Sequence, residues 1–464
     1  MIKENSSPLE RFLPWVTAVA MFMQSLDGTI LDTSLPSIAK SMNHSPLEMQ
    51  SVIVSYTLTL ALFIPLSGWL SDRYGTKKMF IFAVLLFTLG SLFCAFSVDL
   101  LTLNLSRILQ AIGGSMMVPI ARLAILYQYP RNQLLKIMNF ITVPGLLGPV
   151  LGPSLGGFLS DNLSWHWIFL VNLPVGVIGI ILAWRIMPNY KNTTGKFDFW
   201  GLVYFSFALV FITLAMELSS VGISHYALVL FLVFASVLCF VLYYRHFKRH
   251  SAPIINLNLL KIRTLRIGLI GNLITRFGIS GMPFMLPLMM QVGFGFSASK
   301  AGMMLLPSAM MTVSIKPFII RIVHRFGYRK VLISNTLFLA IIIYVFSFME
   351  KDTPLVYYIL LMMGYGTFTS IQMTAMNTIS LADLDDETAS GGNSLLTIMQ
   401  RLALSFGISI SALILSFFKD KMDFYQGDLV TAFHYTLITL AILTAVSSFT
   451  FTKLKTTDGE KMSG

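Results

Sequence analysis

A series of long apolar segments repeats from one end of the chain to the other and leaves few possible folds. Fourteen segments of roughly 18 to 25 residues are apolar enough to cross a bilayer as helices, since about 20 such residues span the hydrocarbon core. They lie near residues 13–35, 49–70, 79–97, 103–126, 137–159, 167–187, 200–217, 225–245, 266–290, 298–319, 331–349, 354–378, 390–417 and 431–452. The sequence therefore predicts an all-α polytopic membrane protein with 14 transmembrane helices.

The charge content excludes a soluble protein. Of the 464 residues, 55% are hydrophobic and only 12% are charged, whereas a soluble domain carries about 25% charged residues. The net charge of +12 does not indicate nucleic-acid binding, because the basic residues are dispersed in short loops and form no continuous face. The expected surroundings are a lipid bilayer.

Metal, cofactor and disulfide chemistry have little support in the sequence. Cys94 and Cys239 lie in distant apolar segments and have no metal-ligand spacing. The seven histidines are scattered among separate segments, so we expect no metal, no cofactor and no enzymatic activity. The polar start of the chain and the full-length first segment do not resemble a cleavable signal peptide.

The distribution of Lys and Arg predicts the topology. An even number of spans places both termini on one side of the membrane. Most of the 33 Lys and Arg residues then fall in loops and tails on the side of the termini, and only a few fall in the opposite loops. By the positive-inside rule, both termini are cytoplasmic.

A faint internal repeat organises the chain. The loop Gly68 to Lys78 and the loop Ile320 to Lys330 share the pattern Arg-aromatic-Gly followed by basic residues. If these loops are equivalent, two related six-helix bundles flank an inserted helix pair. The predicted parts are a cytoplasmic N-terminal tail (1–12), an N-terminal six-helix bundle (13–188), the inserted pair with a basic linker (189–264), a C-terminal six-helix bundle (265–453) and a cytoplasmic tail (454–464).

The fifth segment has an unusual run of glycines and prolines. Its glycines recur at spacings of three and four, so one face lacks side chains and lets another helix approach closely. Its prolines should bend or loosen the helix. Such a helix either packs statically or slides against its neighbour, as a hinge. The residues concerned are Gly145, Gly148, Pro149, Gly152, Pro153, Gly156 and Gly157.

The order of these residues resembles the antiporter motif of drug exporters in the major facilitator superfamily. The loop after the second span is similar to the signature Gly-x-Leu-x-Asp-Arg-x-Gly-x-Lys/Arg of that superfamily. The matching residues are Gly68, Asp72, Arg73, Gly75 and Lys77. The resemblance implies a conformational latch in which Asp72 meets the positive start of a helix in the opposite half, within span thirteen. In the second copy of the loop, His324 replaces the Asp.

Two further motifs indicate proton coupling. Arg107 and Gln110 stand in a pattern similar to the family's Arg-x-x-Gln-Gly-x-Gly, in which the Arg is linked to proton transfer. Asp27 and Asp32 lie in a run that resembles the motif of the family's first helix. They are about 7.5 Å apart along a helix and point in different directions, so a paired-carboxylate mechanism is not expected. Asp27 is the better candidate for the proton carrier, and Asp32 either assists it or is merely hydrated.

Residues that could line a substrate cavity are Gln110, Arg276, Arg401, Met282 and Met285. Embedded arginines are costly, at about 2.5–3.5 kcal/mol on insertion scales, and so should face protein or water. Their surplus over embedded carboxylates leaves open a second possibility, the export of an anionic metabolite such as citrate or a metal chelate.

From about Phe12 to Phe451 the chain resembles the fourteen-helix drug:proton antiporters. That resemblance implies a monomer in the bacterial inner membrane that exchanges protons for small molecules by alternating access. The sequence contains no Gly-x-x-x-x-Gly-Lys-Ser/Thr phosphate-binding motif, so we expect an ion gradient to drive transport. At 100 mV one proton could sustain roughly a fifty-fold substrate gradient.

Overall fold

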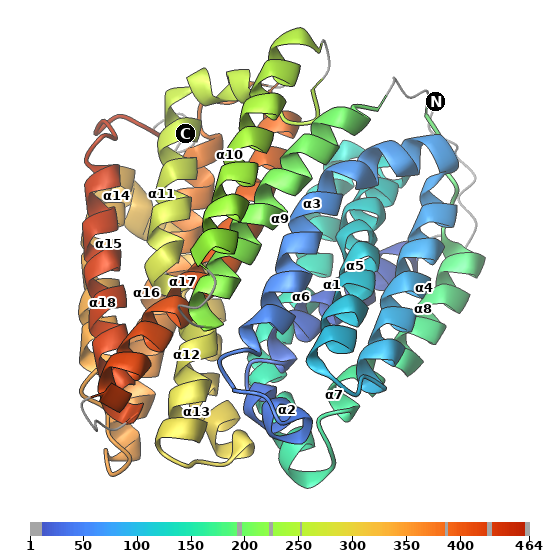
Figure 1. The fold of residues 1–464 in the computed structure, drawn as a ribbon. Helices are drawn as coiled ribbons and strands as arrows, with labels where there is room; N and C mark the ends of the chain where they lie inside the picture. Colours follow the sequence, from blue (N-terminus) through green and yellow to red (C-terminus); the bar gives the residue numbers. More distant parts are fainter. Residues whose placement is uncertain are drawn as a thin grey trace. The chain divides into compact units, whose positions relative to one another are not determined.

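The computed structural model describes residues 12–192, 197–221, 226–250, 253–385, 388–424 and 429–459. Residues 1–11 of the predicted N-terminal tail and residues 460–464 of the predicted C-terminal tail therefore lie outside the described part. Within these ranges the regular structure is helical and contains no strand (Figure 1).

The first group of helices comprises α1 (Leu13–Ile30), α2 (Leu35–Met42), α3 (Gln50–Tyr74), α4 (Thr76–Ala95), α5 (Leu100–Gln128), α6 (Arg131–Asn162), α7 (Trp167–Leu170) and α8 (Asn172–Ile186). The second comprises α9 (Phe199–Val221), α10 (Tyr226–Arg249), η3 (Leu257–Lys261), α11 (Arg263–Ile279), α12 (Met282–Leu288), η4 (Met289–Gly293), α13 (Ala298–Ser314), α14 (Lys316–Phe326), α15 (Tyr328–Phe346), α16 (Leu355–Leu381), α17 (Ala389–Phe424) and α18 (Leu429–Phe451).

Most of the predicted spans are helices of membrane-crossing length. Among the described residues, 11 helical segments are long and apolar enough to cross a membrane, or 12 if α13 and α14, bent by 58° at their junction, form one span. The predicted spans 13–35 and 354–378 correspond to α1 and α16, which are not among these segments. The all-α polytopic fold is confirmed, whereas the number 14 stays a prediction.

The chain divides into two compact units, each with its own core. Unit 1 contains residues 1–197 together with 297–303, and unit 2 contains 198–296 and 304–464. The core of unit 1 includes Phe80, Phe87 and Met117, from α4 and α5. The core of unit 2 includes Leu332 and Met376, from α15 and α16. Each unit thus buries apolar side chains between its own helices.

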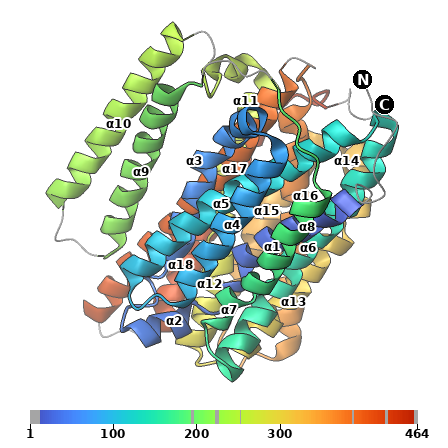
Figure 2. The same cartoon turned by 90° about the vertical axis from the view of Figure 1, so that its right-hand side faces the viewer.

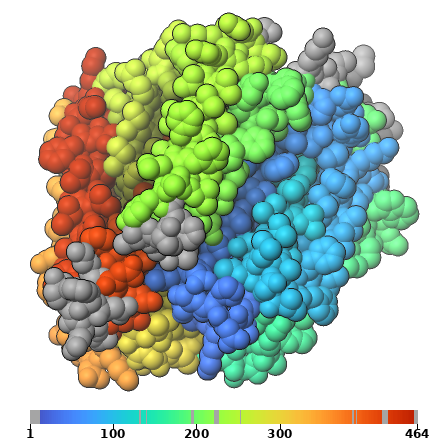
Figure 3. Space-filling model, viewed as in Figure 1, coloured from blue at the N-terminus to red at the C-terminus, as the bar shows by residue number. Residues whose placement is uncertain are grey.

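The predicted inserted pair belongs to unit 2. Helix α9 packs against α17, and α10 lies along α9 (Figure 2). Large apolar side chains of α10 are exposed, among them Leu230, Phe231 and Phe234, which are 69%, 62% and 66% exposed. The yellow-green atoms of α10 form a continuous surface strip in Figure 3. A strip of this kind is suited to contact with lipid.

The two similar loops share a backbone conformation. Gly75 joins α3 to α4 with φ of 101°, and Gly327 joins α14 to α15 with φ of 76°. A positive φ is readily adopted only by glycine. The chain that follows α8 lies against the first loop, where the Thr76 amide donates to the Tyr190 carbonyl at 3.0 Å. In unit 2, Gly459, which follows α18, lies against Tyr328 of the second loop. The two loops are therefore built alike.

Candidate functional site

The centre of unit 1 contains a buried ion pair. The Arg107 guanidinium, on α5, donates to Asp27 Oδ2, on α1, at 2.8 Å. Each residue is only 1% exposed. A charge removed from water in this way is costly unless it is paired and hydrogen-bonded. Two of the three residues predicted to act in proton coupling, Asp27 and Arg107, are therefore in direct contact.

Gln110 connects the two charges. Arg107 donates a hydrogen bond to Gln110 Oε1 at 2.6 Å, and Gln110 Nε2 donates one to Asp27 Oδ1 at 2.7 Å. Because Arg107 and Gln110 are three residues apart on α5, they share a helix face. Gln110 was predicted to line a substrate cavity, and the structure places it, fully buried, inside this network.

Two further residues of the network were not predicted as site residues. Asn172, the first residue of α8, donates to Asp27 Oδ1 at 3.0 Å and to Ser91 Oγ at 3.2 Å. Ser91, on α4, also accepts a hydrogen bond from Gln110 Nε2 at 2.6 Å. The signal in the sequence was an amide residue within an apolar segment. Helices α1, α4, α5 and α8 thus all contribute to one buried cluster.

Aromatic rings cover the guanidinium. The Arg107 Cζ lies 4.0 Å from the ring centroid of Tyr56, on α3, and 5.9 Å from that of Phe169, on α7. Such rings attract a desolvated cation. The buried Nε atom of Arg107 has no hydrogen-bond partner among the described residues. The two rings and Asp27 therefore stabilise the Arg107 guanidinium, although its Nε makes no hydrogen bond among the described residues.

The glycine face of α6 packs against the helix that carries Asp27. A Cβ atom at Gly148, Gly152 or Gly156 would overlap Ser25, Thr29 or Ile30 of α1. Hydrogen bonds cross the same contact, since Thr29 Oγ1 donates to the Gly148 carbonyl at 3.3 Å. The absence of side chains on α6 therefore sets the position of the segment of α1 around Asp27.

The other residues of the predicted hinge lie along the same helix. Thr33 Oγ1 donates to the Pro153 carbonyl at 2.7 Å, and Gly145 faces Met21. Gly157 lies against the backbone of Ala298, in the segment 297–303 that belongs to unit 1. Helix α6 continues through Pro149 and two further prolines as one element.

Asp32 lies beyond the end of α1, in the turn that leads to α2. It is buried, at 8% exposure. Among the hydrogen bonds of the described residues, none joins its carboxylate to Asp27 or Arg107. Arg107 nevertheless interacts electrostatically with Asp32. Both carboxylates of the first segment therefore lie within the field of the same cation, and only Asp27 is hydrogen-bonded to it.

The residues of the predicted latch surround the loop between α3 and α4. Asp72 Oδ1 accepts hydrogen bonds from Asn192 Nδ2 at 3.0 Å and from the Tyr127 hydroxyl at 3.3 Å. The Arg73 guanidinium lies 4.9 Å from the centroid of the Trp69 ring. A Cβ at Gly75 would collide with Asn189.

At the remaining latch positions, Lys77 is partly buried, and no atom lies within 4 Å of the position that a Cβ at Gly68 would take. Contacts within unit 1 thus hold this loop, and its role as a latch stays a prediction.

A comparison with protein families identifies the fold that holds this cluster. The model of the Major Facilitator Superfamily matches residues 17–408, which include nearly all of unit 1 and most of unit 2. The chain belongs to the Major Facilitator Superfamily. It is therefore a membrane transporter and not an enzyme.

Relatives within this superfamily match almost the entire chain. A protein of Pectobacterium atrosepticum named "Putative multidrug resistance protein MdtD" is 43% identical over 446 residues, with 96% of each chain covered. A protein of the same name from Escherichia coli is 42% identical over 450 residues, which cover 96% of this chain and 94% of the relative. These matches confirm the resemblance to drug exporters drawn from the motifs.

Solved structures of other facilitators share the fold at low identity. An auto-inhibited peptide transporter of the POT family has a TM-score of 0.70 at 13% identity, with 97% of this chain and 98% of that chain covered. A bacterial homologue of the human lysosomal transporter Spinster has a TM-score of 0.67 at 16% identity, with 96% and 97% covered. At such identities the likeness concerns the fold alone.

The predicted cavity residues of unit 2 lie on three helices of this facilitator. Arg276, on α11, interacts electrostatically with Arg401, on α17, and its Nε donates to Asn272 Oδ1 at 3.3 Å. Met282 and Met285, on α12, are 0% and 1% exposed. The arginines are therefore close to each other, and the two methionines are packed in the interior.

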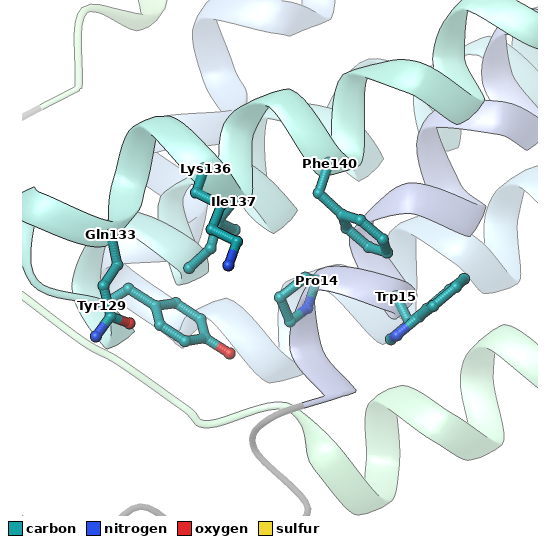
Figure 4. A pocket seen from close by; sticks show the side chains of 7 residues that line it. All are labelled: Pro14, Trp15, Tyr129, Gln133, Lys136, Ile137 and Phe140. Atoms are coloured by element: carbon teal, nitrogen blue, oxygen red, sulfur yellow. The ribbon is translucent and has the colours of Figure 1, made fainter.

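A pocket of about 530 Å³ lies in unit 1 of the facilitator, away from the buried cluster. The start of α1, the end of α5 and the start of α6 form its walls, where Trp15 and Phe140 meet edge to face at 4.8 Å (Figure 4). Its lining consists of Pro14, Trp15, Tyr129, Gln133, Lys136, Ile137 and Phe140. None of the predicted site residues lines it.

Proposed function

We propose that this facilitator is a proton-coupled exporter of drugs or other small amphipathic molecules. The name of its relatives, multidrug resistance protein, supports this proposal. The facilitator resides in the bacterial inner membrane with both termini in the cytoplasm. Two six-helix bundles and an inserted pair, α9 and α10, make up the chain, which acts as a monomer. Transport proceeds by alternating access, and Asp72 with its neighbours acts as a latch.

The observation that carries this proposal is the buried contact between Asp27 and Arg107. A proton that binds Asp27 removes the negative charge that balances Arg107 and weakens the hydrogen bond from Gln110. The electrostatic energy of the cluster therefore depends strongly on one proton, because opposite charges interact strongly in a medium of low dielectric constant.

The packing of α1 on α6 couples protonation of Asp27 to a movement of the two helices. Asp27 and the residues that contact Gly148 and Gly152 belong to the same helix, α1. A change in the partners of Asp27 thus acts on a contact whose smooth glycine surface offers little resistance to sliding. Protonation shifts the equilibrium between the inward-facing and outward-facing states of the transporter. Export of a substrate in exchange for the proton completes the transport cycle.

To test the proposal, the purified protein is reconstituted in vesicles with an imposed pH gradient, and uptake of a fluorescent lipophilic cation is followed. We expect uptake to require the gradient and to fall at least tenfold in Asp27→Asn and in Arg107→Ala. The control Asp99→Asn changes a carboxylate in the exposed turn before α5 and should transport normally. Uptake that ignores the pH gradient, or that persists unchanged in both network variants, contradicts the proposal.

A second candidate function rests on the proximity of Arg276 and Arg401. Two cations near each other within the membrane region are costly, and an anionic substrate between or beside them would offset that cost. In the same vesicles, saturable citrate transport that is lost in Arg276→Gln would favour the export of an anionic metabolite or its metal chelate. Transport of lipophilic cations alone would exclude it.

A further inference from the structure

A second cluster of polar side chains lies in unit 2, far along the chain from the Asp27 network. Helices α9 and α10 run antiparallel, so the start of α9 meets the end of α10 (Figure 2). Asp198 immediately precedes α9, while His246 lies in the last turn of α10 and His250 directly follows that helix. The three residues thus come from two helix ends.

The carboxylate of Asp198 is held by three separate segments. Its Oδ1 accepts hydrogen bonds from the Gly201 amide at 2.9 Å and from His246 Nε2 at 2.6 Å. Its Oδ2 accepts one from the amide of Ile254, in the linker towards α11, at 3.1 Å. Asp198 is only 4% exposed. These bonds fix the carboxylate before any ligand arrives.

The two histidines are arranged on one side of the end of α10. Their spacing of four residues places them one above the other on a helix, and the His250 amide donates to the His246 carbonyl at 3.0 Å. Their rings stack with centroids 5.0 Å apart and an interplanar angle of 27°. One coordinating atom from each of Asp198, His246 and His250 lies within 4.8 Å of the others.

We propose that Asp198, His246 and His250 form a binding site for a divalent transition-metal ion, for which Zn²⁺ is the best match. Two imidazoles and one carboxylate make up a donor set that binds Zn²⁺ in proteins, with a fourth position left for water. Bonds of about 2.0–2.1 Å to a tetrahedral ion place the donor atoms about 3.3 Å apart. The His246–Asp198 contact therefore opens by less than 1 Å as the hydrogen bond is replaced by coordination.

The surroundings favour a metal that binds through imidazole. Arg245, Lys248 and Arg249 lie on the same end of α10, and these cations repel a metal held by charge alone. Mg²⁺ and Ca²⁺ prefer sites made entirely of oxygen donors. The site thus selects Zn²⁺, Co²⁺ or Ni²⁺ over the hard cations.

A bound ion would tie together the start of α9, the end of α10 and, through the Ile254 amide, the linker that leads to α11. This proposal is independent of the proton-coupled mechanism. The sequence analysis did not predict this cluster. The i, i+4 spacing of His246 and His250 is visible in the sequence, but Asp198 lies 48 residues before His246.

The test uses the full-length protein in detergent after removal of any affinity tag and of bound metals with a chelator. Zn²⁺ binding is measured by equilibrium dialysis, and Co²⁺ serves as a spectroscopic probe of coordination. We expect one Zn²⁺ per chain, a Co²⁺ absorption typical of tetrahedral nitrogen and oxygen ligands, and no competition from Mg²⁺.

The variants His246→Ala, His250→Ala and Asp198→Asn should each lower the Zn²⁺ affinity at least tenfold. Asn can still cap α9, so Asp198→Asn separates coordination from folding, and the unfolding midpoint of each metal-free variant verifies its fold. The matched control is His44→Ala, which removes another histidine–carboxylate pair of the described residues, His44 with Glu48 at 2.6 Å. Equal Zn²⁺ binding by the wild type and the His246→Ala/His250→Ala double variant overturns the proposal, as does loss of binding in His44→Ala alone.

Discussion

At the scale of single residues, the arrangement around Asp27 explains how an arginine can be buried in a membrane bundle. Asp27 neutralises Arg107, Gln110 bridges them, and the Tyr56 ring covers the guanidinium. Asn172 gives the carboxylate another donor. Each partner lowers the cost of the charge, so the cluster is stable only when it is complete.

Asp27→Asn should therefore destabilise the protein by leaving Arg107 without its counter-ion. Removing one partner of a buried ion pair costs about 3–5 kcal/mol. The free energy of unfolding is measured by titration of the detergent-solubilised protein with sodium dodecyl sulfate. The double variant Asp27→Asn/Arg107→Gln should lose less free energy of unfolding than the sum of the losses in Asp27→Asn and Arg107→Gln, because no unpaired charge remains in it. Strictly additive losses would mean that the pair does not interact energetically.

At the scale of helices, the contact between α1 and α6 depends on the absence of side chains. At Gly156 a Cβ atom would overlap the Ile30 carbonyl, whereas at Gly28, on α1, no atom lies within 4 Å of its position. Two glycines of the same region thus have opposite surroundings, and only the first is required by packing.

Gly156→Ala should force α1 and α6 apart and cost about 1–3 kcal/mol, as overpacking does. Gly28→Ala is the matched control and should be neutral or stabilising by up to about 1 kcal/mol, because alanine favours a helix. The same unfolding titration measures both. Equal effects in the two variants would show that the close contact does not constrain the helices.

The two repeated loops allow a second comparison at this scale. Gly75→Ala meets both a strained backbone and a collision with Asn189, while Gly327→Ala meets only the strain, since the nearest atom is the Thr456 carbonyl oxygen at 4.0 Å. We expect a loss of about 1–3 kcal/mol for Gly327→Ala and a larger loss for Gly75→Ala. Thermal unfolding of the two variants provides the measurement, and a larger loss for Gly327→Ala would contradict it.

At the scale of the whole molecule, the bias of basic residues predicts the topology in the membrane. With Cys94 and Cys239 replaced by Ala, single cysteines are introduced at Lys78 and at Val98, both of which are exposed. In intact cells, a thiol reagent that does not cross the membrane should label Val98→Cys but not Lys78→Cys. The reverse pattern would show that the termini face outward.

Much of the candidate site was predictable, because the motifs mark their own residues. Asp27 and Arg107 stand out as charges in apolar segments, where only a paired or functional charge persists. Ser91 carries no such signal, since a serine inside a membrane helix usually bonds to its own backbone. Its part in the network follows from the approach of α4 to α5 and α8.

The sequence by itself determined the fold class and the superfamily, because long apolar segments permit only a helix bundle and the ordered motifs are specific. It also indicated the glycine face of α6. Only the tertiary structure decided which side chains meet: Asp27 with Arg107, Gln110 and Asn172, and Asp198 with two histidines of α10. The physical reason is that these contacts join residues 48 to 145 positions apart, and local patterns do not encode how separate helices are placed against one another.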